Sequence, residues 1–130
     1  MATNPIVLDS GAISALAEEK GSLRHALSQA LAAGVLVVVP AVVLAESLTG
    51  TSRDTSANRL LKRLRVVDTD EAIARHAGAL RYAVRASGEG TIDAIVIATA
   101  QSLGRAVVWA GDVRDLTRLA DLAQTAIISI

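Results

Sequence analysis

The sequence has no cysteine and no phenylalanine, and it has a single tryptophan and a single tyrosine among its 130 residues. Without cysteine the chain forms neither disulfides nor zinc–thiolate sites, which favours a cytoplasmic location. Because aromatic residues make up only 2% of the chain, the core has to be built from valine, leucine, isoleucine and alanine.

Long apolar runs and an excess of one charge are also missing. No run approaches the roughly 18 residues of a membrane-spanning helix, and the N-terminus lacks the basic and apolar regions of a signal peptide. Lysine plus arginine equals aspartate plus glutamate, at 13 each. No global field therefore attracts nucleic acid, and any polyanion has to bind at a local patch. We expect no membrane association.

Hydrophobic residues, in contrast, are abundant, at 52% of the chain. A chain of this length forms one domain, residues 1–130. So much apolar surface is more than a small monomer easily buries, so we expect a homodimer or a tightly bound partner.

Short β-branched runs alternate with helical stretches along the whole chain. We expect strands at 6–8, 35–39, 65–67, 106–109 and 126–129. We expect helices at 10–19, 22–33 (ended by Gly34), 56–64, 69–86 (capped by Thr69), 92–103 (capped by Thr91) and 113–123, with a further short helix after Pro40. This alternation predicts an α/β fold with a central, mainly parallel sheet of about five strands and helices on both faces.

Four carboxylates lie inside or just after hydrophobic segments, namely Asp9, Glu46, Asp93 and Asp112. A carboxylate in apolar surroundings is costly unless it is paired or binds a cation. In open parallel sheets, ligands bind beyond the carboxyl ends of the strands, and the expected topology can bring all four acids to that edge.

Four neighbouring carboxylates require a cation between them. Two of them about 5 Å apart repel by roughly 3 kcal/mol at an effective dielectric constant of about 20. An all-oxygen ligand set favours Mg²⁺ or Mn²⁺ over zinc. Either ion can activate a water molecule for attack on a phosphodiester.

Each acid also has a structural interpretation. Asp9 and Asp112 could be helix N-caps, and Asp93 could interact with a helix dipole. Glu46 lies in a helix interior, where it could simply point into solvent. Caps alone do not account for the whole set.

Four segments carry a family resemblance, and they span essentially the whole chain: IVLDSGAISAL, VPAVVLAES, TIDAIVIATAQSLG and GRAVVWAGDVRDLTRLA. In this order and spacing the chain resembles the PIN-domain family and, within it, the VapC-type toxins of type II toxin–antitoxin pairs. The resemblance implies a single PIN domain and an endoribonuclease that depends on Mg²⁺ or Mn²⁺. It also implies a cognate VapB-like antitoxin as partner.

The resemblance also gives individual residues a role. Asp9, Glu46, Asp93 and Asp112 match the four catalytic, metal-binding acids, while Ser10 and Asp115 match supporting positions beside the first and fourth acids. The family commonly has threonine or serine just before the fourth acid, but this chain has Ala110-Gly111-Asp112. That departure leaves open an alternative, a catalytically weakened PIN-fold module that sequesters RNA or a protein partner.

Basic residues cluster after Glu46 and are candidates for contacts with RNA phosphates, namely Arg53, Arg59, Lys62 and Arg63. The alternative is a solvated helix face. Apolar residues at 12–16 and 27–31 are candidates for the antitoxin groove.

A phospho-acceptor receiver domain fits poorly, because Asp9 has no adjacent acid and the segment QTAIISI has no lysine. A haloacid-dehalogenase-type phosphatase fails similarly, since Asp9-Ser10-Gly11 lacks the second aspartate.

Overall fold

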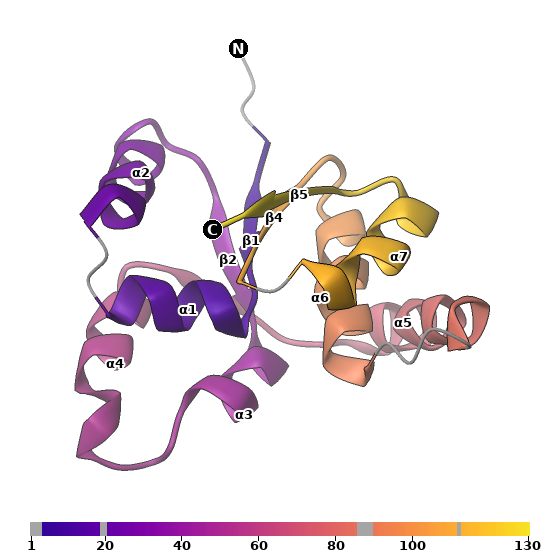
Figure 1. The fold of residues 1–130 in the computed structure, drawn as a ribbon, viewed down its shortest axis with the longest axis horizontal. Coiled ribbons are helices and arrows are strands. Elements are labelled where there is room, and N and C mark those ends of the chain that lie inside the picture. The colour runs from indigo at the N-terminus through magenta and orange to yellow at the C-terminus, as the bar shows by residue number, and fades with distance from the viewer. Residues whose placement is uncertain (1–3, 19–20, 86–89, 112) are drawn as a thin grey trace.

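A parallel sheet of five strands, in the order β3-β2-β1-β4-β5, runs through the centre of the protein (Figure 1). The computed structural model describes residues 4–18, 21–85, 90–111 and 113–130. The strands are β1 (Ile6–Leu8), β2 (Val37–Pro40), β3 (Arg65–Val67), β4 (Val107–Ala110) and β5 (Ala126–Ser129). The expected α/β fold with a parallel sheet is confirmed.

The three central strands are apolar throughout because both of their faces are covered. Val7 of β1 pairs with Val38 of β2 on one side and with Val108 of β4 on the other, and all three side chains are fully buried. Such continuous Val/Ile/Leu runs are typical of parallel strands between two helical layers. The edge strands β3 and β5 are more exposed.

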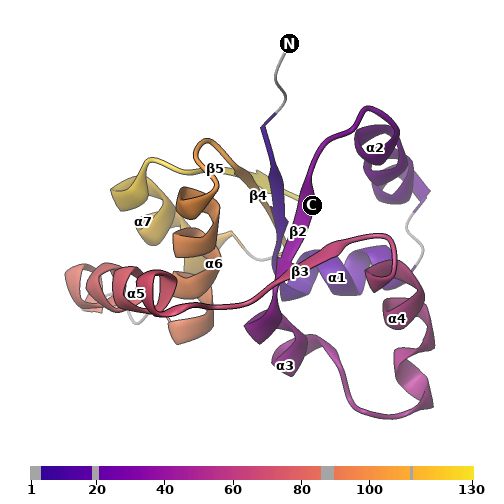
Figure 2. The same cartoon turned by 180° about the vertical axis from the view of Figure 1, so that it is seen from behind.

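Helices cover both faces of the sheet (Figures 1 and 2). On one side lie α1 (Ser10–Ala17), α2 (Gly21–Ala32) and α4 (Thr55–Leu61), and on the other α5 (Glu71–Ala83), α6 (Thr91–Ser102) and α7 (Arg114–Ala123). The short elements η1 (Ala41–Val43), α3 (Leu44–Ser47) and η2 (Ser52–Asp54) link β2 to α4. Helix α6 packs directly on the sheet and is buried from Ala94 to Ala100, as its sequence predicts.

Two predicted helix caps are wrong by one residue. Helix α5 is capped by Asp70, whose Oδ1 accepts a hydrogen bond of 2.8 Å from the Ile73 N–H. The Thr69 hydroxyl is instead buried, with no hydrogen-bond partner in the described part of the chain. At α6 the capping residue is Gly90, in an extended conformation, and Thr91 is already helical. Threonine and aspartate are both good caps, so the sequence alone did not distinguish adjacent candidates.

The end of α2 follows its prediction. Gly34 has a φ of +80°, and its N–H donates to the Leu31 carbonyl. A glycine in the left-handed region ends a helix without steric cost, so the chain turns here into β2.

None of the helices in residues 4–18, 21–85, 90–111 and 113–130 is long and apolar enough to cross a bilayer.

Candidate active site

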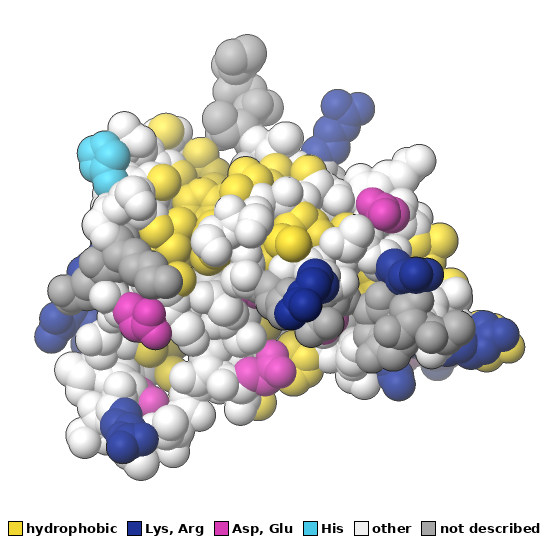
Figure 3. Space-filling view, in the orientation of Figure 1, with side chains coloured by type: hydrophobic (Ala, Val, Ile, Leu, Met, Phe, Trp, Pro, Cys, Tyr) yellow, Lys and Arg dark blue, Asp and Glu magenta, His cyan; other side chains and the backbone are white. Residues whose placement is uncertain are grey.

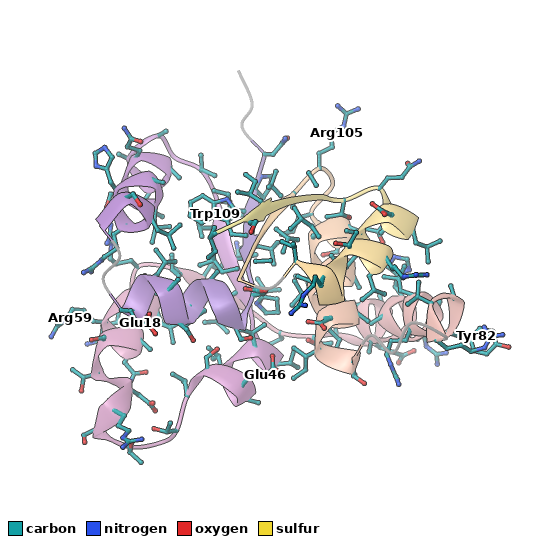
Figure 4. The ribbon with its side chains drawn as sticks, viewed as in Figure 1. Glu18, Glu46, Arg59, Tyr82, Arg105 and Trp109 are labelled. Atoms are coloured by element: carbon teal, nitrogen blue, oxygen red, sulfur yellow. The ribbon has the colours of Figure 1, made fainter. Side chains whose placement is uncertain are left out.

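The carboxyl ends of β1, β2 and β4 meet at one edge of the sheet, the lower edge in Figure 1. Asp9 directly follows β1, Glu46 is in the first turn of α3, and Asp93 is in the first turn of α6. Figure 4 places Glu46 at this edge, between α1 and α6. Asp112 lies outside the described residues.

Asp9 is a buried carboxylate held by backbone donors. Its side chain is 8% exposed, and its Oδ1 accepts hydrogen bonds from the Ala12 N–H at 2.8 Å and the Gly111 N–H at 3.3 Å. The Ala12 bond makes Asp9 the N-cap of α1, so the capping interpretation is correct for this acid. The cap also fixes where the carboxylate lies relative to β1 and β4.

Burial raises the pKa of Asp9, and the negative charge of Glu46 adds to the increase. The backbone N–H groups of Ala12, Gly111 and Gly11 act in the opposite direction and lower the pKa, but burial is the largest effect. The two acids therefore interact electrostatically across the edge of the sheet, although 37 positions separate them in sequence.

Glu46 is more accessible than its sequence context suggests. The sequence predicts a position about two turns into a continuous helix, between apolar residues. The segment is instead a 3₁₀ turn, η1, followed by the four-residue helix α3, and the Glu46 side chain is exposed. It faces solvent, as the alternative interpretation expected, but it does so at the carboxyl edge beside Asp9.

Asp93 enters the same edge from the other helical layer. Helix α6 contacts β1, β4 and η1, the turn that leads into α3. Asp93 is half-buried there. The N-terminal turn of a helix favours negative charge, so α6 supports a carboxylate at this position.

Two glycines bring the N-terminal and C-terminal parts of this edge into contact. A Cβ atom on Gly11 would lie 2.7 Å from the Gly111 Cα, and one on Gly111 would lie 2.8 Å from the Gly11 Cα. Neither backbone can accommodate a side chain at such distances. The missing hydroxyl before Asp112 thus has a structural reason, because position 111 packs against the first turn of α1. This contact is not predicted by the sequence, in which its only signal is a glycine near each of two acids.

Comparison with known proteins now identifies the fold family. The family model described as PIN domain matches residues 6–122. The chain belongs to the PIN-domain family. PIN-domain nucleases generally use divalent metal ions.

The PIN domain is also similar to chains of several solved complexes. One is from the Rickettsia felis VapBC2 complex bound to a promoter DNA fragment, with 16% identity, a TM-score of 0.77, and coverage of 96% of this chain and 98% of that one. Another is from DNA-bound VapBC of Salmonella typhimurium, with 20% identity, a TM-score of 0.77 and 98% coverage of both chains. A third, from VapBC-1 of nontypeable Haemophilus influenzae, has 20% identity, a TM-score of 0.74, and coverage of 95% and 96%. A search of curated proteins found no significant match.

The remaining predicted residues of this PIN domain are spread more widely. Ser10 is the first residue of α1 and is half-buried, while the side chain of Asp115 lies outside the described residues. The four basic residues predicted to contact RNA are all exposed. Arg53 borders a cavity between α1 and α4, near the acids. Arg59 projects from α4 on the side away from Glu46 in Figure 4. Arg63 reaches Ser28 of α2, with its Nη2 3.5 Å from the Ser28 Oγ.

The donor set of the PIN domain fits a hard divalent cation. Within the described residues, no group of three or more acids or histidines lies close enough to hold a metal ion, and Asp112 is not among those residues. The described acids offer only oxygen donors, and Asp9 carries a buried charge that repels Glu46. A divalent cation would relieve both the burial cost and the repulsion. Figure 3 shows acidic side chains in the lower part of this face, over α1 and α3.

Proposed function

We propose that this PIN domain is the toxin of a VapBC-type toxin–antitoxin pair, an endoribonuclease that depends on Mg²⁺ or Mn²⁺ and acts in the cytoplasm. The observation that carries the proposal is the buried Asp9 carboxylate, coupled to Glu46 at the carboxyl edge of a PIN fold. Buried carboxylates with raised pKa values at such an edge are typical of sites that act on substrates.

In this proposal Asp9, Glu46, Asp93 and Asp112 hold the ion. When bound, Mg²⁺ or Mn²⁺ supplies a Lewis acid and makes a water molecule nucleophilic at neutral pH. The chain's own part is to place its acids. Asp9 is fixed by the N–H groups of Ala12 and Gly111, whereas Glu46 is exposed and can accept a proton from the attacking water at a carboxylate oxygen.

An antitoxin partner is supported by the solved relatives. The structures from Rickettsia felis, Salmonella typhimurium and Haemophilus influenzae are VapBC complexes, and a similar chain from Klebsiella pneumoniae is described as part of a toxin–antitoxin complex. The predicted antitoxin groove needs a correction, however. Ala12, Ile13, Leu16 and Leu27 are buried in the chain's own core, so these residues do not form an open groove.

The proposal is tested by incubating the purified protein with single-stranded RNA, with Mg²⁺ or Mn²⁺ and with EDTA. We expect cleavage only with metal, and we expect Asp93→Asn to reduce it at least a hundredfold by removing a charged ligand. Glu71→Gln is the matched control, because Glu71 is an exposed acid paired with Arg75 on α5. An Asp93→Asn protein as active as the wild type would show that the site is assigned wrongly.

A second candidate, a weakened PIN-fold module that binds RNA or a protein partner without cutting, is favoured by one observation. Gly111 replaces the hydroxyl residue that the family commonly has before its fourth acid. Titration calorimetry with Mn²⁺ separates the two functions. A nuclease should bind Mn²⁺ at millimolar concentrations or tighter, and the weakened module should not.

A further inference from the structure

A cavity of about 270 Å³ lies beside the acidic edge, between α1, α3 and the segment from η2 to α4. It begins close to the candidate active site, since Ser47 in its wall directly follows Glu46, and Ile13 lies one helical turn beyond Asp9. At about 1.5 Å per residue, its residues along α1, from Ile13 to Glu18, lie about 6 to 14 Å from Asp9.

The lining of this cavity combines a small apolar part with several polar groups. Its apolar part is small, because Ala17 is half-buried while Ile13 and Ala57 behind it are almost fully buried. Three serines, Ser14, Ser47 and Ser56, also border it, and the Ser47 hydroxyl already donates to the Val43 carbonyl. This combination suits a flat ligand with an apolar face and a polar edge, and the volume is slightly below that of pockets for drug-sized molecules.

Two opposite charges border the same cavity without neutralising each other. Glu18 and Arg53 are both exposed, and neither forms an ion pair with any residue that the structure describes. Figure 4 shows Glu18 at the far end of α1 from Glu46. The cavity therefore offers a carboxylate acceptor and a guanidinium donor to one ligand.

The third charged group, Asp54, is already occupied. Its carboxylate accepts hydrogen bonds from the Thr49 and Gly50 N–H groups, at 2.9 and 2.7 Å, and from the Thr49 hydroxyl at 2.8 Å. These bonds fix the loop that carries Arg53. The fold thus holds the backbone of Arg53 beside the cavity.

We propose that this cavity is a nucleobase subsite, and the proposal rests on RNA being the substrate of the acidic edge. Glu18 accepts a hydrogen bond from the amino group of a base, and Arg53 binds a phosphate of the same strand. At about 3.4 Å per stacked nucleotide, the subsite lies at most about four nucleotides from the scissile phosphate. Uracil has an N3–H donor but no exocyclic amino group, so a site that binds an amino group prefers adenine, cytosine or guanine.

The test measures binding separately from cleavage. Asp93→Asn protein without metal is titrated into fluorescent octamers of adenosine, cytidine or uridine, and anisotropy gives the three dissociation constants. We expect the better of the adenosine and cytidine octamers to bind about fivefold or more tighter than uridine. Adding Glu18→Ala should remove that preference. Adding Arg53→Ala should weaken all three complexes. It should also reduce the slope of the logarithm of the binding constant against the logarithm of the salt concentration by about 0.7.

Matched controls come from the exposed pair on α5. Glu71→Ala and Arg75→Ala remove the same charges from the opposite helical layer, and neither should alter the base preference. Thermal unfolding confirms that each variant is folded.

The outcomes separate this proposal from the proposed function. Metal-dependent cleavage by the wild type, combined with a base preference that survives Glu18→Ala, overturns the subsite and leaves the nuclease. A preference that Glu18→Ala abolishes, in a protein that cuts no RNA, rejects the nuclease and with it a subsite for a substrate, and it leaves a cavity that only binds RNA. If the Glu18 and Arg53 variants bind RNA normally but lose a copurifying antitoxin, the cavity is a protein contact and the proposal is wrong.

Discussion

Asp9 serves as a helix cap and as a candidate metal ligand at the same time. The hydrogen bonds from Ala12 and Gly111 both go to Oδ1. A carboxylate has two oxygens with several lone pairs, so capping does not exhaust its capacity to bind a cation. The two interpretations that the sequence presents as alternatives are therefore compatible.

Replacing Asp9 by asparagine should preserve the fold and abolish metal binding. Asparagine is also a good N-cap, and it removes the buried charge that Glu46 repels. Burial raises the pKa of Asp9, so the folded state binds a proton at this side chain more tightly than the unfolded state does. The protonated carboxyl therefore stabilises the fold fully below its unfolded pKa, and this stabilisation is lost as the pH rises through the folded pKa. At pH 7 without metal, the Tm of Asp9→Asn should thus equal or exceed that of the wild type.

Thermal unfolding between pH 4 and pH 8, with and without Mn²⁺, checks this. Mn²⁺ should raise the Tm of the wild-type protein, because an ion that binds only the folded state stabilises it. The Tm of Asp9→Asn should not change with Mn²⁺. A metal-free Asp9→Asn that unfolds several degrees lower would mean that the carboxylate is mainly structural.

Gly111 should tolerate no side chain. A Cβ there would lie 2.8 Å from the Gly11 Cα, so Gly111→Ala has to displace backbone and should lower the free energy of unfolding by about 1–3 kcal/mol. Gly78→Ala is the matched control, because nothing lies within 4 Å of its added Cβ and alanine favours the interior of α5 by about 0.4–1 kcal/mol. Urea denaturation measures both changes, and equal effects would contradict the contact.

Among the secondary structure elements, the loop before α4 depends on one carboxylate. Hydrogen bonds hold the pKa of Asp54 below its ordinary value despite partial desolvation. The largest effect comes from the Thr49 N–H, and smaller ones come from the Thr49 hydroxyl and the Gly50 N–H. A lowered pKa gives stability that is present above the unfolded pKa and is lost as the pH falls through the folded pKa. Asp54→Ala should therefore lower the Tm at pH 7 and have less effect near pH 3.

Hydrogen exchange of the Thr49 and Gly50 amides localises the effect of Asp54→Ala. Both amides should lose protection while those of β1 and α6 keep theirs. Unchanged protection at the two amides would show that the loop is held in another way.

The strands were predictable because their β-branched runs are continuous and the central ones are bounded by turn residues. The helix starts were less predictable, since Thr69 and Asp70 are neighbouring candidate caps and Asp70 is the one that accepts the hydrogen bond from Ile73. Glu46 was misplaced because a 3₁₀ turn interrupts the helical period. The sequence predicted that the four acids lie at one edge of the sheet, and the structure places Asp9, Glu46 and Asp93 at that edge. Their catalytic role stays a prediction.

The contact between Gly11 and Gly111 could not be predicted. It depends on the register of β1 against β4, in which Leu8 pairs with Trp109. Local patterns carry no information about a register between segments about a hundred residues apart.

Several large hydrophobic side chains are exposed in the described part of the chain, and the predicted homodimer stays our expectation. Hydrophobic side chains gather in the upper part of the face in Figure 3, over β5 and toward α2. On the edge strand, Ile128 is 49% exposed, and Ile130 beyond it is 36% exposed. Apolar edge strands are rarely left open to solvent.

Ile128→Lys should convert the dimer to a monomer, because the interface would have to bury a charge. Light scattering coupled to gel filtration measures the mass. Tyr82→Lys is the control, since Tyr82 is 68% exposed and lies at the far end of α5 in Figure 4. A dimer that survives Ile128→Lys would place the interface elsewhere.

The hydrogen bond from Gly111 to Asp9 joins residues 102 positions apart, and this separation matters while the chain is being made. At about 5–20 residues per second, the ribosome needs roughly 5–20 seconds after Asp9 to reach Gly111. Until then β1 lacks its partner β4 and Asp9 lacks one of its donors. The chemistry proposed for this edge therefore cannot begin in a nascent chain before Gly111 has been synthesised.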